Sequence, residues 1–284
     1  MGVISFGGHP FLMVTGGFPQ ESSVREDGAA CRMPILGPIE AVPEEGAAQG
    51  GGIDMPMDDA RLFAVLAQCF GPAAQDEWER TIGDDEWQAL IARLRALVQW
   101  PDAWGVAAPV KRARRAVPLQ EFLSEREVDA LFSPPSFSLK QKFAARHFTG
   151  GLPDSALPIE SLHVEWTADP KRGLFARQKG LYSADTALYM RDLIDGLGLE
   201  LPENLAAYPD HLSLELDTVS YLLEAGRASD ARQLFLERSE WLTAYRLKLV
   251  ALGEEALFYL AIVDALLGIR AQLLAEEGRG VESA

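Results

Sequence analysis

From residue 57 onward, apolar residues recur at the spacing of one helix face. The stretch that starts at Met57, "MDDARLFAVLAQCF", shows this period, and Asp58 or Asp59 can cap the helix. The stretch 84–100, "DDEWQALIARLRALVQW", shows it again and ends before Pro101. The side chains predicted to face a core are Leu62, Phe63, Leu66 and Phe70 in the first helix, and Trp87, Leu90, Ile91, Leu94 and Leu97 or Val98 in the second.

Most of the remaining chain follows the same pattern. Ser124, followed three residues later by Glu127, forms a capping box for a helix that runs to Phe132. No segment alternates as a strand does, and no fixed-period repeat is present. Residues 149–180 are irregular. The other predicted helices cover 136–148, 181–197, 210–224, 229 to about 251 with Ser229 as its cap, and 254 to about 274. The pattern predicts an all-α fold, a single helical bundle domain.

The first 56 residues differ from this pattern. They contain 11 glycines and 6 prolines and have no sustained period. We expect a disordered leader over 1–56, an all-helical domain over 57–275 and a flexible tail over 276–284. Met55 and Met57 are candidate translation starts, and the sequence leaves open whether residues 1–56 are translated.

The charge balance limits the classes of partner. The chain has 42 acidic and 26 basic residues, a formal net charge of -16. This argues against nucleic-acid binding, which needs basic surface, and leaves plain solubility or a cationic partner. Its 2 cysteines form no CxxC pair and fit a reducing cytoplasm. We expect no apolar run to reach the roughly 20 residues of a membrane span, and therefore no membrane insertion.

The stretch 208–217, "YPDHLSLELD", raises the question of chemistry. Pro209 and Asp210 can start a helix with Asp210 as its N-cap, and Leu212, Leu216, Val219 and Leu223 form an apolar stripe. That explanation leaves His211, Glu215 and Asp217 without a role.

Catalysis is the first role to test. His211 and Glu215 stand at i, i+4, so a metal-dependent helical hydrolase is the alternative function, but no second histidine stands at a metal-ligand spacing. Ser213 is expected to lie on another side of the helix turn and to form no dyad with His211. No nucleophile elbow and no phosphate-binding loop is present. The sequence therefore predicts a protein that is not an enzyme and that holds no metal and no cofactor.

Binding is the second role. Between Asp192 and Gly226 the chain has 8 acidic residues and no Lys or Arg, which predicts either a negative surface near 197–211 or a solvated acidic face. Further upstream, "LPIESLHVEW" over 157–166 gathers apolar and acidic residues outside any helix stripe. This loop either lines a groove or packs over the bundle.

These two stretches, with the intervening "FARQKGLYSADTALYMRDLIDGLGLELP", resemble the cytoplasmic redox-enzyme maturation chaperones of the TorD/DmsD/NarJ type. The "PDH" followed by an apolar and acidic helix is the most recognisable part, and the "ES" segment some fifty residues upstream is the second. The likeness covers roughly residues 57–274.

The resemblance implies an all-helical chaperone that binds the twin-arginine signal peptide and the apo-catalytic subunit of a molybdopterin oxidoreductase. It holds the subunit in the cytoplasm until the cofactor is inserted. Pro209, Asp210 and His211 match one motif of the family, and Glu160 and Ser161 match the other. Either a monomer or a domain-swapped dimer is compatible with it.

The chemistry of such a peptide assigns further residues. Its arginines would pair with carboxylates, for which Asp210, Glu160, Glu215 and Asp217 are candidates. Its apolar part would contact Leu162, Trp166 and Tyr208, with Trp166 in place of the aromatic residue that the family often has at His163. His211 would bond to the peptide backbone, and its titration near neutral pH would tune release.

Overall fold

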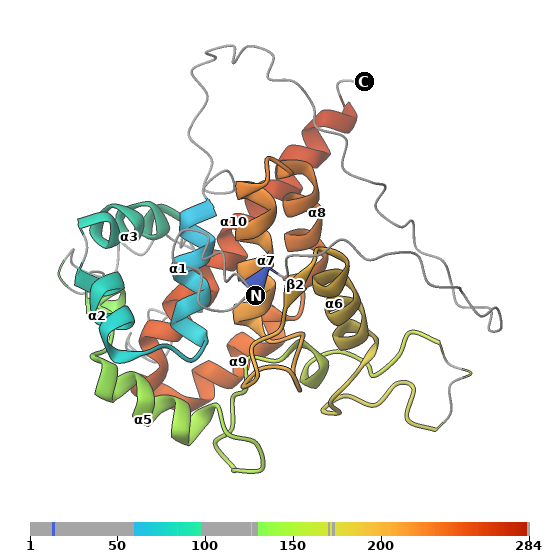
Figure 1. Ribbon diagram of the computed structural model, residues 1–284, viewed down its shortest axis with the longest axis horizontal. Helices are drawn as coiled ribbons and strands as arrows, with labels where there is room; N and C mark the ends of the chain where they lie inside the picture. The colour runs from blue at the N-terminus through green and yellow to red at the C-terminus, as the bar shows by residue number, and fades with distance from the viewer. Residues whose placement is uncertain are drawn as a thin grey trace, which may run out of the picture.

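The computed structural model describes residues 13–14, 60–83, 85–97, 126, 130–169, 171 and 174–282. The described chain is mostly helical, as predicted (Figure 1). Of the predicted leader only Met13 and Val14 are described, and the capping box of Ser124 and Glu127 lies outside the described residues.

The helices follow one another along the chain, separated by connections of very different length. They are α1 (Ala60–Phe70), α2 (Gln75–Gly83), α3 (Asp85–Leu97), α5 (Phe137–His147), α6 (Asp185–Gly196), α7 (Leu212–Glu224), α8 (Ala228–Arg238), α9 (Leu242–Leu252) and α10 (Leu257–Glu282), with the 3-10 turns η4 (Glu160–Leu162) and η6 (Gly253–Ala256). The strands β1 (Met13–Val14) and β2 (Leu199–Glu200) form one short antiparallel pair, which the sequence did not predict. Because α10 continues to Glu282, most of the expected tail is helical.

The helix α7 lies at the centre, packed mainly against α1 and α8 (Figure 1). Every residue from Leu212 to Ser220 is buried, and so is Leu222. The predicted stripe explains only one face of α7. Neighbouring helices cover the other faces, so Glu215 and Asp217 are buried as well, at 3% and 1% exposed.

The predicted stripes of the N-terminal helices are confirmed for the side chains that the structure describes; those of Leu97 and Val98 lie outside them. Leu62, Phe63, Leu66 and Phe70 of α1 are at most 2% exposed, and Trp87, Leu90, Ile91 and Leu94 of α3 at most 6%. Aromatic rings then connect α1, α5 and α10, because the ring of Tyr259 lies 4.1 Å from that of Phe143 and 5.8 Å from that of Phe70.

The helix predicted from Ser229 to about Ala251 is two helices, so that prediction was wrong. α8 begins after Arg227, not at Ser229, and the helical run is interrupted over 239–241 before α9 starts at Leu242. Trp241 turns inward there and is 3% exposed. The helical period continues through the break, so tertiary contacts of Trp241 decide where α8 ends.

One continuous helical stretch, Leu242–Glu277, is long and apolar enough to cross a membrane by length and composition. The expectation that no apolar run reached this length was therefore wrong. Within the protein, 67% of its apolar window is buried, which is typical of the core helix of a globular protein.

Candidate functional site

The "ES" and "PDH" segments, predicted from separate parts of the sequence, form one structure. The Glu160 N–H donates to the Asp210 carbonyl at 3.0 Å, and the Leu212 N–H donates to the Pro158 carbonyl at 2.8 Å. The Ser161 N–H donates to Asp210 Oδ2 at 2.7 Å, and the Ser161 hydroxyl donates to the same oxygen. The two segments therefore hold each other in place at the start of α7.

Asp210 is the centre of this junction, not the N-cap of α7 as predicted. It is 1% exposed, and its carboxylate faces Ser161. Burial raises the pKa of Asp210, while the hydrogen bonds from Ser161 act in the opposite direction. A buried carboxylate with these donors is a structural clamp and presents no free oxygen to solvent.

His211 is the N-cap of α7. Its Nδ1 accepts from the Ser213 N–H at 3.2 Å and lies 2.6 Å from the Ser213 hydroxyl, so the expectation that these two side chains could not meet was wrong. Burial, and secondarily the charge of Lys140, lower the pKa of His211 to about 3. The expected titration near neutral pH is therefore contradicted, and the imidazole is neutral with its proton on Nε2.

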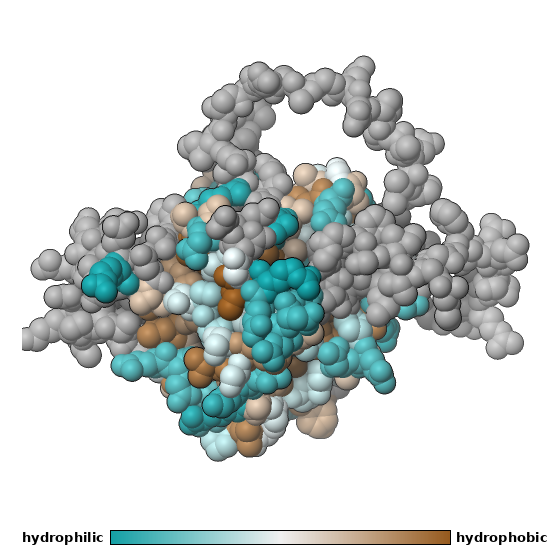
Figure 2. All heavy atoms as spheres, turned by 60° about the vertical axis from the view of Figure 1, so that its left-hand side comes forward, coloured by the Kyte–Doolittle hydropathy of each residue, from teal (hydrophilic) through white to brown (hydrophobic). Residues whose placement is uncertain are grey.

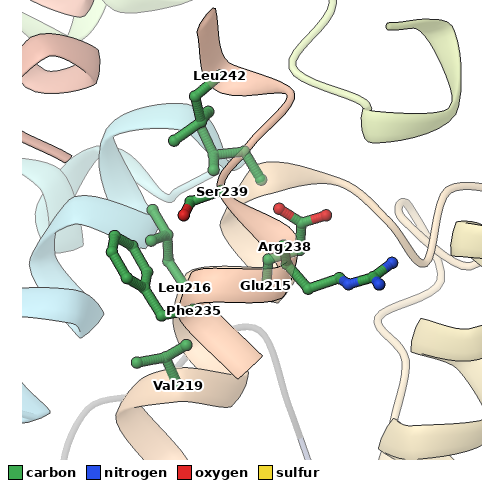
Figure 3. Close-up of a pocket in the computed structure, with 8 residues that line it drawn as sticks. Glu215, Leu216, Val219, Phe235, Arg238, Ser239 and Leu242 are labelled. Atoms are coloured by element: carbon green, nitrogen blue, oxygen red, sulfur yellow. The ribbon is translucent and has the colours of Figure 1, made fainter. Parts of the chain in front are cut away.

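Behind this turn, acidic groups of η4 and α7 meet one arginine of α8. Arg238 Nη1 lies 3.4 Å from Glu160 Oε2, and its guanidinium lies 4.8 Å from the ring of Tyr189. The indole N–H of Trp241 donates to Glu215 Oε2 at 3.3 Å, and His163 stacks on Trp241 at 5.2 Å. Figure 3 shows Glu215 and Arg238 at one side of a cavity of about 10 Å³, with Leu216, Val219 and Phe235 on the other. This space holds about one water molecule and no peptide side chain.

This cluster favours protonated carboxyl groups. Burial raises the pKa of Glu160 to about 7, although Arg238 acts in the opposite direction. Burial also raises the pKa of Glu215 well above its ordinary value, and the neighbouring Glu160 and Asp210 add to that effect. Glu215 and Asp217, predicted to pair with a ligand, are therefore buried framework residues.

The acidic surface predicted near 197–211 is present in part. Of the 8 acidic residues between 192 and 226, Asp210, Glu215 and Asp217 are buried, and Asp192, Asp195, Glu200, Glu203 and Glu224 are exposed. A hollow of about 430 Å³ between α6 and β2 is lined by three of the exposed acids, with Arg191 and three apolar residues, Ile194, Leu199 and Leu201.

An apolar groove of about 590 Å³ lies beside His211. The end of α1, the start of the α1–α2 connection, one face of α5 and the turn 204–205 form its walls, and Figure 2 brings the α5 side forward. Its lining includes Phe70, Phe137, Ala144, Ala145, Phe148 and Leu205. Sequence reasoning missed this groove. Its only sequence signal is Lys140, a base on the inward face of α5.

Lys140 is 5% exposed, and its ammonium group donates to the Gly71 carbonyl at 2.5 Å. Burial lowers its pKa to about 8. The same ammonium lies 5.3 Å from the Trp78 ring, so Lys140 joins the end of α1 to α2 and α5.

The remaining predicted contacts lie around the "PDH" turn. Pro209 is buried, whereas Leu162, Trp166 and Tyr208 are half-buried. Tyr208 pairs with Tyr182 at 5.4 Å between ring centroids. Trp166 belongs to the neighbouring irregular segment, where its N–H donates to the Gln178 carbonyl at 3.0 Å.

The hydrolase alternative gains no support from this geometry. Within the described part of the chain, no group of three or more His, Cys, Asp or Glu side chains could hold a metal ion. His211 faces the apolar groove, whereas Glu215 faces Trp241 and Arg238.

Residues 111–249 match the family model described as "Nitrate reductase delta subunit". The matched region contains α5 to α8 and most of α9, and with them both motifs of the site. No curated protein and no solved structure matches the chain.

Proposed function

The chain belongs to the nitrate reductase delta subunit family, the TorD/NarJ-type chaperones, and from that premise we propose that it binds the twin-arginine signal peptide of its client. Members of this family are non-enzymatic cytoplasmic proteins that assist maturation of a molybdoenzyme catalytic subunit. We propose that this chain acts in the cytoplasm on the apo form of such a subunit, before cofactor insertion and export.

The observation that carries the proposal is the pairing of an apolar groove with an acidic hollow. One segment of chain, from Leu199 to His211, contributes walls to both. A twin-arginine peptide has the matching order of chemistry, two guanidinium groups followed by an apolar stretch. The groove offers phenylalanine and alanine side chains to the apolar stretch.

The exposed acids are better partners for the arginines than the buried acids. Asp192, Asp195 and Glu200 present carboxylates to solvent, where guanidinium groups can reach them without breaking a core contact. Asp192 already accepts from Arg191 at 2.9 Å, so a peptide arginine would share or replace that exposed ion pair. Glu160 and Asp210 instead position the walls of the site through their contacts with Arg238 and Ser161.

His211 supplies a polar contact inside the groove. Its Nδ1 is used by Ser213, so the proton on Nε2 is directed elsewhere and can be donated to a peptide carbonyl. A neutral imidazole donor also avoids repulsion of the peptide's arginines.

Isothermal titration calorimetry of the full chain tests the proposal. We expect a twin-arginine leader peptide to bind, and a leader with both arginines replaced by lysine to bind roughly tenfold more weakly, because lysine cannot form bidentate pairs with carboxylates. Equal affinity for the two peptides, or no binding of either, would refute the proposal.

The groove is tested in the same titration with Ala145→Trp, which fills it from α5. The matched variant is Leu139→Trp, also on α5, at a position that is 57% exposed and does not line the groove. We expect Ala145→Trp to abolish binding and Leu139→Trp to preserve it. Circular dichroism of both variants checks that the helices remain.

A further inference from the structure

The irregular segment between η4 and α6 forms an arm that projects from the helices on the side of α6 (Figure 1). Its base is fixed by backbone bonds, because the Trp166 N–H donates to the Gln178 carbonyl at 3.0 Å and the Thr167 N–H to the Ala176 carbonyl at 3.1 Å. The Thr167 hydroxyl donates to Asp185 at the start of α6 at 2.5 Å. Hydrogen bonds between the two strands of chain at the base, and one bond to α6, therefore fix the base of the arm.

The arm carries two large apolar side chains in direct succession, Leu174 and Phe175, which are called its tip below. Leu174 is 99% exposed and Phe175 is 59% exposed. Among the described residues, the other exposed large hydrophobic side chains stand singly in the sequence. The buried Ala176 and the bond from the Gln178 N–H to the Phe175 carbonyl hold this tip in an outward orientation.

The charge around the tip is opposite to that of the whole chain. Residues 170–180 contain four bases and no acid, whereas the formal net charge of the chain is -16. Lys171, Arg177 and Lys179 are all exposed. The nearest acid before the tip, Asp169, accepts from the Lys171 N–H at 2.9 Å, so it caps the local backbone.

We propose that this tip is a contact site for an anionic membrane surface. A convex apolar pair enters the boundary between headgroups and acyl chains, and the flanking bases meet the lipid phosphates. A protein partner would have to offer a pocket shaped to this tip as well as acidic groups, whereas a lipid surface adapts to it. The contact is shallow and reversible, and it is separate from the groove and the acidic hollow.

Vesicle flotation of the full chain tests the proposal. We expect the protein to float with vesicles of phosphatidylcholine containing about 30% phosphatidylglycerol, and not with phosphatidylcholine alone, because the flanking bases are attracted only to the anionic headgroups. Leu174→Ser with Phe175→Ser should lower the floating fraction at least about fivefold. Leu152→Ser, at a loop leucine that is 45% exposed, is the matched variant and should float as the wild type does.

Two results would overturn the proposal. One is absence of flotation with the anionic vesicles, and the other is equal flotation of the wild type and the double serine variant. If the double variant instead loses capture of a purified client while vesicles bind neither protein, the tip is a protein contact and the membrane proposal fails. Signal-peptide titration with the same variant reports on the groove separately.

Discussion

At the scale of single residues, Glu160 links the site to the stability of the fold. Its carboxyl group faces Glu215 of α7 and Arg238 of α8, with Asp210 close by, and burial raises its pKa from 4.5 to about 7. Between these two values the folded state binds more protons than the unfolded state. The contribution of Glu160 to the free energy of unfolding is therefore largest below pH 4.5 and is lost as the pH rises through about 7.

We predict that Glu160→Gln reduces the loss of unfolding free energy as the pH rises. The wild type should lose at most roughly 3 kcal/mol from this group between pH 4.5 and pH 7.5, and the variant should lose less because the amide does not titrate. Urea unfolding at both pH values measures the difference. Glu165→Gln, at an exposed position five residues away, should behave as the wild type does. An unchanged pH dependence in Glu160→Gln would contradict the prediction.

Asp210 shows why burial changes the meaning of a motif. The sequence predicted that Asp210 pairs with an arginine of the peptide, so Asp210→Ala would be expected to weaken binding and to leave the helices intact. The structure shows that Asp210 accepts from both the N–H and the hydroxyl of Ser161 in the core. Loss of the Asp210 carboxylate would leave the buried donors of Ser161 without a partner. Reduced peptide binding in such a variant would therefore reflect a disturbed fold and not the loss of a direct contact with the peptide.

At the scale of helices, the break between α8 and α9 depends on Trp241. Its indole N–H donates to Glu215, and its ring stacks on His163 and packs against Tyr245 at 5.5 Å. These contacts join α9 to α7 and to the "ES" loop.

We predict that Trp241→Ala lowers the free energy of unfolding by roughly 3–5 kcal/mol, because it leaves a cavity in the core. Trp241→Phe keeps an aromatic ring and loses the hydrogen bond to Glu215, so it should cost only about 1–2 kcal/mol. Denaturant unfolding of both proteins measures these values. Trp166→Phe, at a half-buried position of the irregular segment, is the control. Wild-type stability in both Trp241 variants would contradict the prediction.

The helices differ in how well the sequence predicts them. α1 and α3 were predicted with core residues that the structure buries, because those residues recur at the spacing of one helix face. The same rule fails at α7, where the acids Glu215 and Asp217 are buried although they lie off the apolar stripe. Packing between segments that are far apart in the sequence decides whether these acids are buried, and it also decides where α8 ends.

The candidate site was also predicted only in part. The two motifs contained the residues that meet at Asp210, but the groove depends on α1, α5 and the 204–205 turn, which have no shared sequence signal. The run without bases over 192–226 predicted one acidic surface. This run contains exposed acids on α6 and β2 as well as buried acids on α7. The spacing of residues along the chain does not distinguish the exposed acids from the buried ones.

At the scale of the whole molecule, the net charge of -16 sets a negative field around the proposed peptide site. Charges that lie on the surface are screened over about 10 Å at 0.1 M salt and over about 3 Å at 1 M salt. Binding that relies on the exposed acids must therefore depend on salt, whereas burial of the peptide's apolar part must not weaken with salt.

We predict that the affinity for a twin-arginine leader falls roughly tenfold between 0.05 and 0.5 M sodium chloride. The triple variant Asp192→Asn, Asp195→Asn, Glu200→Gln should bind more weakly at low salt and respond less to added salt. A second triple variant, Glu79→Gln, Glu165→Gln, Glu240→Gln, makes the same change of net charge at exposed positions outside the acidic hollow. If both variants lower the affinity equally, the field of the whole molecule attracts the peptide, and the hollow has no specific role. A loss confined to the first variant assigns the arginines to α6 and β2.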